Sequence, residues 1–243
     1  MRATYHSDIF FPSDKDELLA LASPLDKREE KKAIIVPHQD LRLAAKAYQE
    51  AFRYIPNKAR IIALLPLHGE KLLKDGDNIV FEPEEMEIET PIGSLTLETL
   101  DLNKAEHYAE EEYSAELIMP YVQTSCPNSK LSIVFTSVKN AEESKKLAKL
   151  IDKWNDENTF FIISSNLTGR LKDKETLNIE KNKAIEALSN GEKLLDSYRK
   201  GHISICASPI IDALSRVIDG KWKLIESVED VSTGHASFFK ETK

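Results

Sequence analysis

The segment Ala33-Ile34-Ile35-Val36-Pro37-His38 is an uncharged and mostly β-branched run that ends in a proline and a histidine. The stretch from Ile61 to His68 repeats this order, with apolar residues before Pro66-Leu67-His68. Runs of this kind predict strands that are buried on both faces of a parallel sheet. Apolar residues at helical spacing fill 41–52, so the unit is strand, helix, strand. Ligands gather outside the carboxyl ends of such strands, where we expect His38 and His68 to lie side by side.

The rest of the chain continues this alternation. Further strands are predicted at 131–136, 159–164, 221–226 and 236–239, and an apolar strand-like run at 203–206. Helices are predicted at 14–22, 117–122 and 210–218, after Asn140, and around 184–188 with Gly191 at its C-terminal end. Around Thr90-Pro91-Ile92-Gly93 the period changes to two, which predicts an inserted β-hairpin within 86–97. The sequence therefore predicts an α/β fold with three layers, a central and mostly parallel sheet flanked by helices, and a single domain over 1–243.

Charge and composition exclude several classes of function. The 243 residues carry a formal net charge of −8, which argues against a nucleic-acid partner and against an anionic membrane surface. The chain has 8 glycines and neither a GxGxxG nor a P-loop pattern, so no nucleotide cofactor is expected. Its two cysteines give no disulfide framework, and the first residues lack the basic and apolar regions of a signal peptide. We therefore expect a cytoplasmic protein.

Cys206 is a third candidate ligand beside the two histidines. It ends the run 203–206 and precedes Ser208-Pro209, where serine is a good N-cap and proline a good first helical residue. The dipole of a helix N-terminus favours the thiolate, which is the form that binds metals. Two imidazoles and a thiolate leave coordination positions open, as a catalytic or substrate-binding metal requires. The alternatives remain that each histidine only hydrogen-bonds a loop and that Cys206 is a small buried apolar residue.

Several short motifs follow one another along the chain. They are Ile9-Phe10-Phe11-Pro12 with Leu18-Leu19, Ile34-Ile35-Val36-Pro37-His38, Leu65-Pro66-Leu67-His68, Thr90-Pro91-Ile92-Gly93, Glu112-Tyr113-Ser114-Ala115-Glu116 with Met119-Pro120-Tyr121, Ser164-Ser165-Asn166, and Ile205-Cys206 with Pro209-Ile210. In order and spacing they resemble a divergent member of the Memo family, whose bacterial members are called AmmeMemoRadiSam system protein B. The resemblance runs nearly from end to end of the chain.

The resemblance implies a fold and a metal site. The family's fold is similar to the catalytic subunit of class III extradiol dioxygenases, which are metal-dependent α/β proteins. Its metal site is built from the two motif histidines and the motif cysteine, which correspond to His38, His68 and Cys206. Iron or copper is the metal that the resemblance implies, and a site of sulfur and imidazole also accepts zinc. The family name further implies partners among the AmmeMemoRadiSam-associated proteins.

The chain departs from the family pattern at positions that handle protons. Tyr113 replaces the histidine of Glu-His-Ser-x-Glu, and Asn166 and Gly169 replace the aspartate and histidine of Ser-Ser-Asp-x-x-His. Tyr113 donates a hydrogen bond but is a poor base near neutral pH, and Asn166 cannot titrate. Glu116 is retained and joins Tyr113 and Asn166 as a candidate residue of the cleft. Its plainer role would be that of a solvated or helix-capping carboxylate.

The remaining histidines belong to no such pattern. His6, His107 and His202 fit no constellation, so we interpret them as surface or loop residues. His235 lies in Gly234-His235-Ala236, where the family has Gly-Tyr-Ala, and we interpret it as structural.

Two functions from different classes fit these observations. The first is a Memo-like metal-binding protein, redox-related, in which an open metal position takes a small molecule and the proton-transfer residues are partly lost. The second is a non-catalytic scaffold, in which a vestigial cleft holds a protein or peptide segment. The sequence favours the metal site, leaves open whether turnover survives, and identifies neither the ligand nor the oligomeric state.

Overall fold

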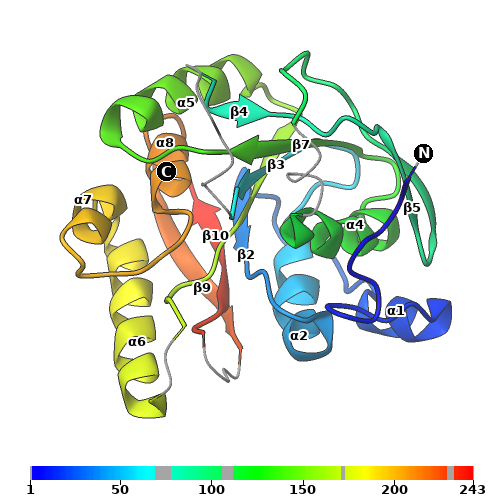
Figure 1. Ribbon diagram of the computed structural model, residues 1–243, viewed down its shortest axis with the longest axis horizontal. Coiled ribbons are helices and arrows are strands. Elements are labelled where there is room, and N and C mark those ends of the chain that lie inside the picture. Colours follow the sequence, from blue (N-terminus) through cyan, green and yellow to red (C-terminus); the bar gives the residue numbers. More distant parts are fainter. Residues whose placement is uncertain (1, 69–77, 106–111, 171–172, 229–232, 243) are drawn as a thin grey trace.

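The main sheet lies at the centre of the computed structural model, which describes residues 2–68, 78–105, 112–170, 173–228 and 233–242 (Figure 1). Over these residues the sheet has seven strands, in the order β4 (Val80–Phe81), β7 (Lys130–Thr136), β3 (Arg60–Pro66), β8 (Thr159–Ser164), β2 (Ala33–Val36), β10 (Ala236–Glu241) and β9 (Lys221–Ser227). The four inner strands β7, β3, β8 and β2 are parallel to one another. The flanking strands β4, β10 and β9 pair in antiparallel fashion. The predicted central and mostly parallel sheet is therefore confirmed.

The parallel strands form at short, uncharged and mostly apolar runs of the sequence. They are β2 (Ala33–Val36), β3 (Arg60–Pro66), β7 (Lys130–Thr136) and β8 (Thr159–Ser164), and beyond its first residue each is buried along its whole length. In the register, Val36 lies opposite Ser164 and Pro66 lies opposite Thr136. The carboxyl ends of these strands consequently meet at one edge of the sheet, which is where ligands bind in α/β folds.

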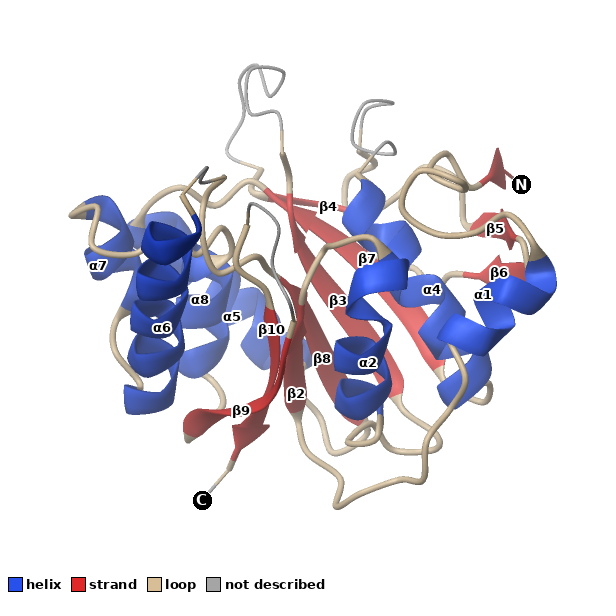
Figure 2. Cartoon of the chain, turned by 90° about the horizontal axis from the view of Figure 1, so that it is seen from below, coloured by secondary structure: helices blue, strands red, loops and turns tan. Residues whose placement is uncertain are grey.

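Helices cover both faces of the sheet, as Figure 2 shows. One face packs against α1 (Lys15–Leu21), α2 (Leu41–Phe52) and α4 (Tyr113–Ser125). The other packs against α5 (Ala141–Trp154), α6 (Lys174–Asn190), α7 (Leu194–Arg199) and α8 (Ser208–Ser215). Alternate strand residues enter the two cores, so Ile34 and Val36 lie in the first and Ala33 and Ile35 in the second. The three predicted layers are confirmed.

The inserted hairpin is also confirmed, and it carries an unpredicted partner. It consists of β5 (Glu87–Thr90) and β6 (Gly93–Thr96), and it forms a separate small sheet with β1 (Arg2–Ala3). The strands β1 and β4 (Val80–Phe81) are too short for any sequence period to reveal them. Because β1 pairs with β5, the beginning of the chain lies against the hairpin and α4.

Two helices begin or end at residues that the sequence predicted. Asn140 caps α5, because its side chain accepts from the amides of Glu142 and Glu143. Gly191 ends α6 with φ of 70°, a left-handed conformation that favours glycine. The late strands are β9 (Lys221–Ser227) and β10 (Ala236–Glu241), which match the predicted pair.

Gly220, at the start of β9, gives a test of this arrangement. Its φ is +119°, and a Cβ built there would overlap the backbone carbonyl of Glu241 at the end of β10. We expect Gly220→Ala to lower the free energy of unfolding by about 3 kcal/mol or more, because clash and backbone strain act together. Urea denaturation measures the loss. Gly201→Ala is the control: φ there is +72° with nothing within 4 Å of the Cβ position, so strain alone should cost about 1–2 kcal/mol. Equal losses in the two variants would contradict the role of the close approach.

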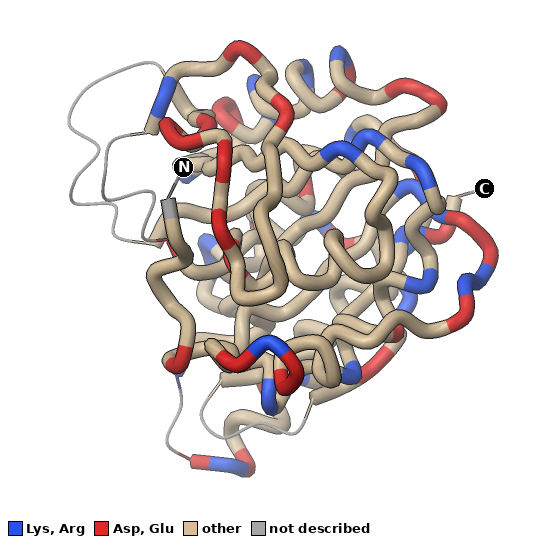
Figure 3. Tube along the Cα trace, turned by 90° about the vertical axis from the view of Figure 1, so that its right-hand side faces the viewer, with Lys and Arg blue, Asp and Glu red and all other residues tan. Residues whose placement is uncertain are grey.

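Two surface properties complete the description. No helix among the described residues combines the length and the apolar character that a membrane crossing requires. Lysine and arginine are interspersed with aspartate and glutamate around the trace (Figure 3), although acidic residues are in excess.

Candidate metal centre

The structure brings His38, His68 and Cys206 together at the carboxyl edge of the sheet. Each histidine is the second residue after its strand, and Cys206 lies two residues before α8. One ligand atom from each residue lies within 4.8 Å of the other two. The Sγ of Cys206 is 3.6 Å from Nε2 of His38, and the two imidazole centroids are 4.8 Å apart. With ligand bonds of about 2.0–2.3 Å, the most distant pair would close by roughly 1 Å to share one ion.

Cys206 reaches this site by a route that the sequence did not predict. Residues 203–206 do not form a strand. In the sheet, β2 is already paired with β8 and β10, and β8 is paired with β2 and β3, so neither has a free edge for a further strand. The amide of Cys206 donates instead to the carbonyl of Asn166 at 3.2 Å, in the loop that leaves β8. The predicted N-cap is also wrong. Ala207 precedes the first turn of α8, and the hydroxyl of Ser208 donates to the carbonyl of Ile205 at 2.7 Å.

His38 is held by the neighbouring strand. Its side chain is buried, and Nδ1 lies 3.0 Å from Oγ of Ser164, the last residue of β8. Its backbone amide donates to Oδ1 of Asn166 over 3.4 Å. With Nδ1 engaged by the hydroxyl, Nε2 faces the sulfur of Cys206. A second hydrogen bond of this kind fixes the orientation of metal-binding histidines.

His68 is held by a carboxylate. Oε2 of Glu112 lies 2.9 Å from its Nδ1 and also accepts its backbone amide at 3.2 Å. Oε1 of the same carboxylate accepts the amide and hydroxyl of Ser114, so Glu112 is at once the N-cap of α4 and the anchor of His68. The carboxylate is buried, whereas 41% of the His68 side chain is exposed. This role of Glu112 was not predicted, because it depends on a contact with His68, 44 positions away in the chain. The signal in the sequence is an acidic residue just before a predicted helix.

The charges of the site are coupled. Burial alone would raise the pKa of Cys206, but His38 and hydrogen bonds from His38, His68 and Ser165 hold it well below the ordinary value. Burial alone would lower the pKa of His68, but its hydrogen bonds with Cys206 and Glu112 and their charges raise it to about 10. Despite its burial, Glu112 has a lowered pKa because of His68. The metal-free site therefore favours a thiolate and a protonated His68.

Tyr113 forms a wall of this site. Its ring centroid is 5.6 Å from that of His38 and 6.1 Å from that of His68, and its opposite contact is Phe10, stacked at 4.3 Å with an angle of 9°. Burial, together with Glu112 and Cys206, raises its pKa above the ordinary tyrosine value. Tyr113 therefore keeps its phenolic proton at neutral pH.

Asn166 and Gly169 lie in the loop after β8. The amide of Asn166 donates to Sγ of Cys206 at 3.1 Å, and its side chain accepts from His38 as described. Asn166 therefore touches two of the three candidate ligands without a group that titrates. Gly169 is exposed, and nothing lies within 4 Å of the position that a Cβ would take. The chain consequently places no proton-carrying side chain at either of these positions.

Glu116 serves the N-terminal segment. Its buried carboxylate accepts the backbone amides of Tyr5 and His6, each at 2.9 Å, and lies 3.1 Å from Nδ1 of His6. His6 lies in a loop, as predicted, and its ring also packs 6.0 Å from that of Tyr113, a contact that the sequence did not predict. The two residues are 110 positions apart, so no local pattern could pair them.

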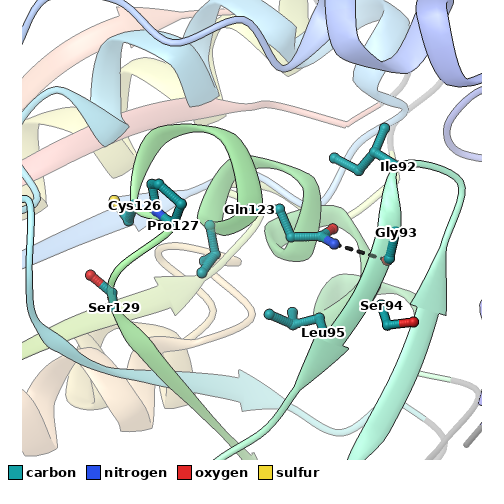
Figure 4. A pocket seen from close by; sticks show the side chains of 9 residues that line it. Ile92, Gly93, Ser94, Leu95, Gln123, Cys126, Pro127 and Ser129 are labelled. Atoms are coloured by element: carbon teal, nitrogen blue, oxygen red, sulfur yellow. Dashed lines mark hydrogen bonds between the residues drawn. The ribbon is translucent and has the colours of Figure 1, made fainter.

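The other histidines and the second cysteine lie elsewhere. His202 is exposed, His235 is buried, and His107 lies outside the described residues. A pocket of about 280 Å³ lies between the hairpin and the end of α4, and Cys126 contributes to its lining. In this pocket the side-chain amide of Gln123 donates to the carbonyl of Gly93 at 2.9 Å (Figure 4). None of the three candidate ligands lines this pocket.

Comparisons with known proteins identify a family for the chain. The family model described as Memo-like protein matches residues 2–225. No curated protein matches the chain. Among solved structures, the chain is similar to an uncharacterized protein from Escherichia coli, with 9% identity and a TM-score of 0.47 over 86% of this chain and 100% of that one. Because the family model spans nearly the whole sequence, the chain belongs to the Memo-like protein family.

Proposed function

We propose that the protein binds one transition-metal ion through His38, His68 and Cys206, and that a small-molecule ligand takes the remaining coordination positions. The observation that carries this proposal is the convergence of three ligand atoms within 4.8 Å of one another. Each of the three also has a second partner that orients it: Ser164, Glu112 and the amide of Asn166. Exposure of the His68 side chain leaves the site open on one side.

The donor set limits which metals fit. One thiolate and two imidazoles suit iron, copper and zinc, whereas magnesium and calcium prefer oxygen ligands. Family resemblance favours iron or copper over zinc, and either would supply one-electron chemistry when bound. The residues of this chain would orient the ligand through Tyr113 and Asn166 and hold the thiolate in its charged form.

A redox-related role is the finer part of this proposal, and a non-catalytic scaffold is its alternative. Asn166 and Gly169 favour the alternative, because neither side chain can carry the proton of a substrate. In that case the cleft would hold a protein or peptide segment, and AmmeMemoRadiSam-associated proteins are the partners that we propose to test. We further propose that the protein acts in the cytoplasm.

Elemental analysis tests the metal proposal directly. Protein purified without an affinity tag, with and without dithionite, should contain about one equivalent of one transition metal when all three ligands are present. His38→Ala should lose this metal, whereas His202→Ala should retain it, because His202 is exposed and apart from the cluster. Equal metal contents in these two variants would exclude the site.

Ser164→Ala tests the support of His38. Removing the hydroxyl 3.0 Å from Nδ1 frees the imidazole to rotate, so we expect the metal affinity to fall by about 10-fold. Competition with a chromophoric chelator measures this change. Ser132→Ala is the matched control, because Ser132 is also a buried serine of the central sheet and its hydroxyl has no hydrogen-bond partner in the described structure. An unchanged affinity in Ser164→Ala would show that the hydroxyl does not orient the ligand.

A further inference from the structure

A second cavity lies beside β4, at the outer edge of the main sheet, where α5 runs next to this strand (Figure 1). We call it the edge cavity. It is lined by residues 78–80 and 101–103 and by one side of α5 between Lys146 and Lys153. Its volume of about 440 Å³ is within the range of small-molecule sites. None of the three candidate metal ligands lines it, so the edge cavity is a separate candidate site.

Part of the lining of the edge cavity is apolar. Ile79, Val80 and Leu102 line it from the side of β4, and Leu150 lines it from α5. All four side chains belong to the second core or pack against it, so their positions are fixed by the fold. Apolar surface that borders an open cavity stays in water until a ligand covers it, and covering it stabilises the complex. The lining therefore favours a ligand with an apolar body.

The polar part of the lining carries an excess of positive charge. Lys146, Lys149 and Lys153 follow one another at spacings of three and four residues, so they share one face of α5. Within the described part of the chain, none of these three ammonium groups makes an ion pair or a hydrogen bond. The lining has one acidic residue, the exposed Asp101. Like charges at these spacings repel one another, and an anion between them would remove this repulsion.

The loop that contributes 101–103 is held in place by a buried carboxylate. Glu82 accepts the hydroxyl of Thr99 at 2.8 Å and the backbone amide of Leu100 at 2.9 Å. The ammonium group of Lys104 donates to the same carboxylate at 2.8 Å. These contacts fix the loop on both sides of 101–103 before any ligand binds. A site that is already formed loses less conformational entropy when its ligand arrives.

We propose that the edge cavity binds a small organic anion, with its apolar body against Val80 and Leu102 and its anionic oxygens among the three lysines. Ammonium groups on flexible stems bind such oxygens as point charges, so a carboxylate fits the site without a fixed geometry. The volume suits one small molecule, whereas a protein partner would bury about 800 Å² on each side. This inference goes beyond the proposed function, because no candidate metal ligand takes part in it.

Calorimetric titration with 2-naphthoate, in the presence of a chelator, tests the charge of the site. We expect a Kd below about 1 mM for the full-length protein. Lys149→Gln should weaken binding about fivefold, the upper end for one exposed ion pair. The neutral analogue 2-naphthamide should bind more weakly than 2-naphthoate and should not distinguish Lys149→Gln from the wild type. Lys145→Gln is the matched control, because Lys145 is an exposed lysine of α5 that does not line the cavity. Equal affinities of the two variants for 2-naphthoate would overturn the inference.

Amide chemical shifts locate the bound anion. Addition of 2-naphthoate should shift the amides of residues 79–80, 101–103 and 146–153 more than those of any other segment. Shifts confined to other parts of the chain, or a Kd above about 1 mM, would overturn the inference. An acidic peptide with one phenylalanine is titrated in parallel. If this peptide binds at the same residues and 2-naphthoate does not, the class of ligand is wrong and the cavity belongs to a protein partner.

Discussion

Cys206→Ser is expected to lower the affinity for the metal by about 100-fold or more. The thiolate is the charged and soft donor of the set, and a serine hydroxyl stays protonated at neutral pH. Loss of a ligand should exceed the cost of changing a residue that merely orients one, which is about 10–100-fold. Metal content after gel filtration and competition with a chelator both measure this loss. Circular dichroism should remain that of the wild type, because Cys206 lies in a loop and in neither sheet.

Alkylation of the two cysteines provides the control for this prediction. Iodoacetamide should label Cys206 faster after chelation than before, since a bound ion shields the sulfur. Cys126 should label slowly in both states, because it is buried and its pKa is raised by burial. If Cys206→Ser keeps its full metal content and the chelator does not change the rate at which Cys206 is labelled, Cys206 is not a ligand of the metal.

Metal affinity is expected to rise by about tenfold per pH unit, or about 10³-fold between pH 6 and pH 9, from His68 alone. The pKa of His68 is raised to about 10, so this imidazole is protonated in the metal-free protein over that range. A histidine must be neutral to bind a metal, so the proton and the metal compete for His68. Each unit of pH below 10 therefore lowers the apparent metal affinity by a factor of ten. Cys206 contributes less to this dependence than an ordinary thiol would, because its pKa is lowered well below the ordinary value.

Calorimetry in buffers of different ionisation enthalpy measures the protons released when the metal binds, and we expect the release from His68 to be about one per ion at pH 7.5. Glu112→Gln is the informative variant, since it removes a charge that raises the pKa of His68. In this variant the rise of affinity should level off at a lower pH than in the wild type. An affinity that does not change with pH would show that His68 is neutral before the metal arrives.

The sequence predicted those strands and helices whose residues follow a local apolar pattern. The strands at 33–36, 131–136 and 159–164 are buried on both faces, so each appears as an unbroken apolar run, and each is observed with the expected bounds within one residue. His38 and His68 were placed correctly because a residue that follows a parallel strand must emerge at the carboxyl edge of the sheet. The convergence of these two side chains was therefore a consequence of topology.

What the sequence did not predict depends on contacts between distant segments. The order of the strands in the sheet comes from packing, and no period of the chain contains it. Cys206 was placed near the site for a partly wrong reason, since residues 203–205 form no strand and Ser208 is not the N-cap of α8. The pairing of His6 with Glu116 is the clearest case, because a loop histidine carries no periodic signal and its partner lies 110 residues away.

The first turn of α4 sets a strict limit on changes in length. Glu112 and Glu116 are four residues apart and so lie on nearly the same side of the helix, with Tyr113 between them along the chain. Deletion of one residue within this turn would rotate one carboxylate about 100° from the other around the axis. His68 and the N-terminal segment could then no longer be held at the same time. In an alignment of this family we therefore expect substitutions in this turn to be far more common than gaps. A protein with a gap there should lack either the contact of Glu112 with His68 or the contact of Glu116 with the N-terminal segment.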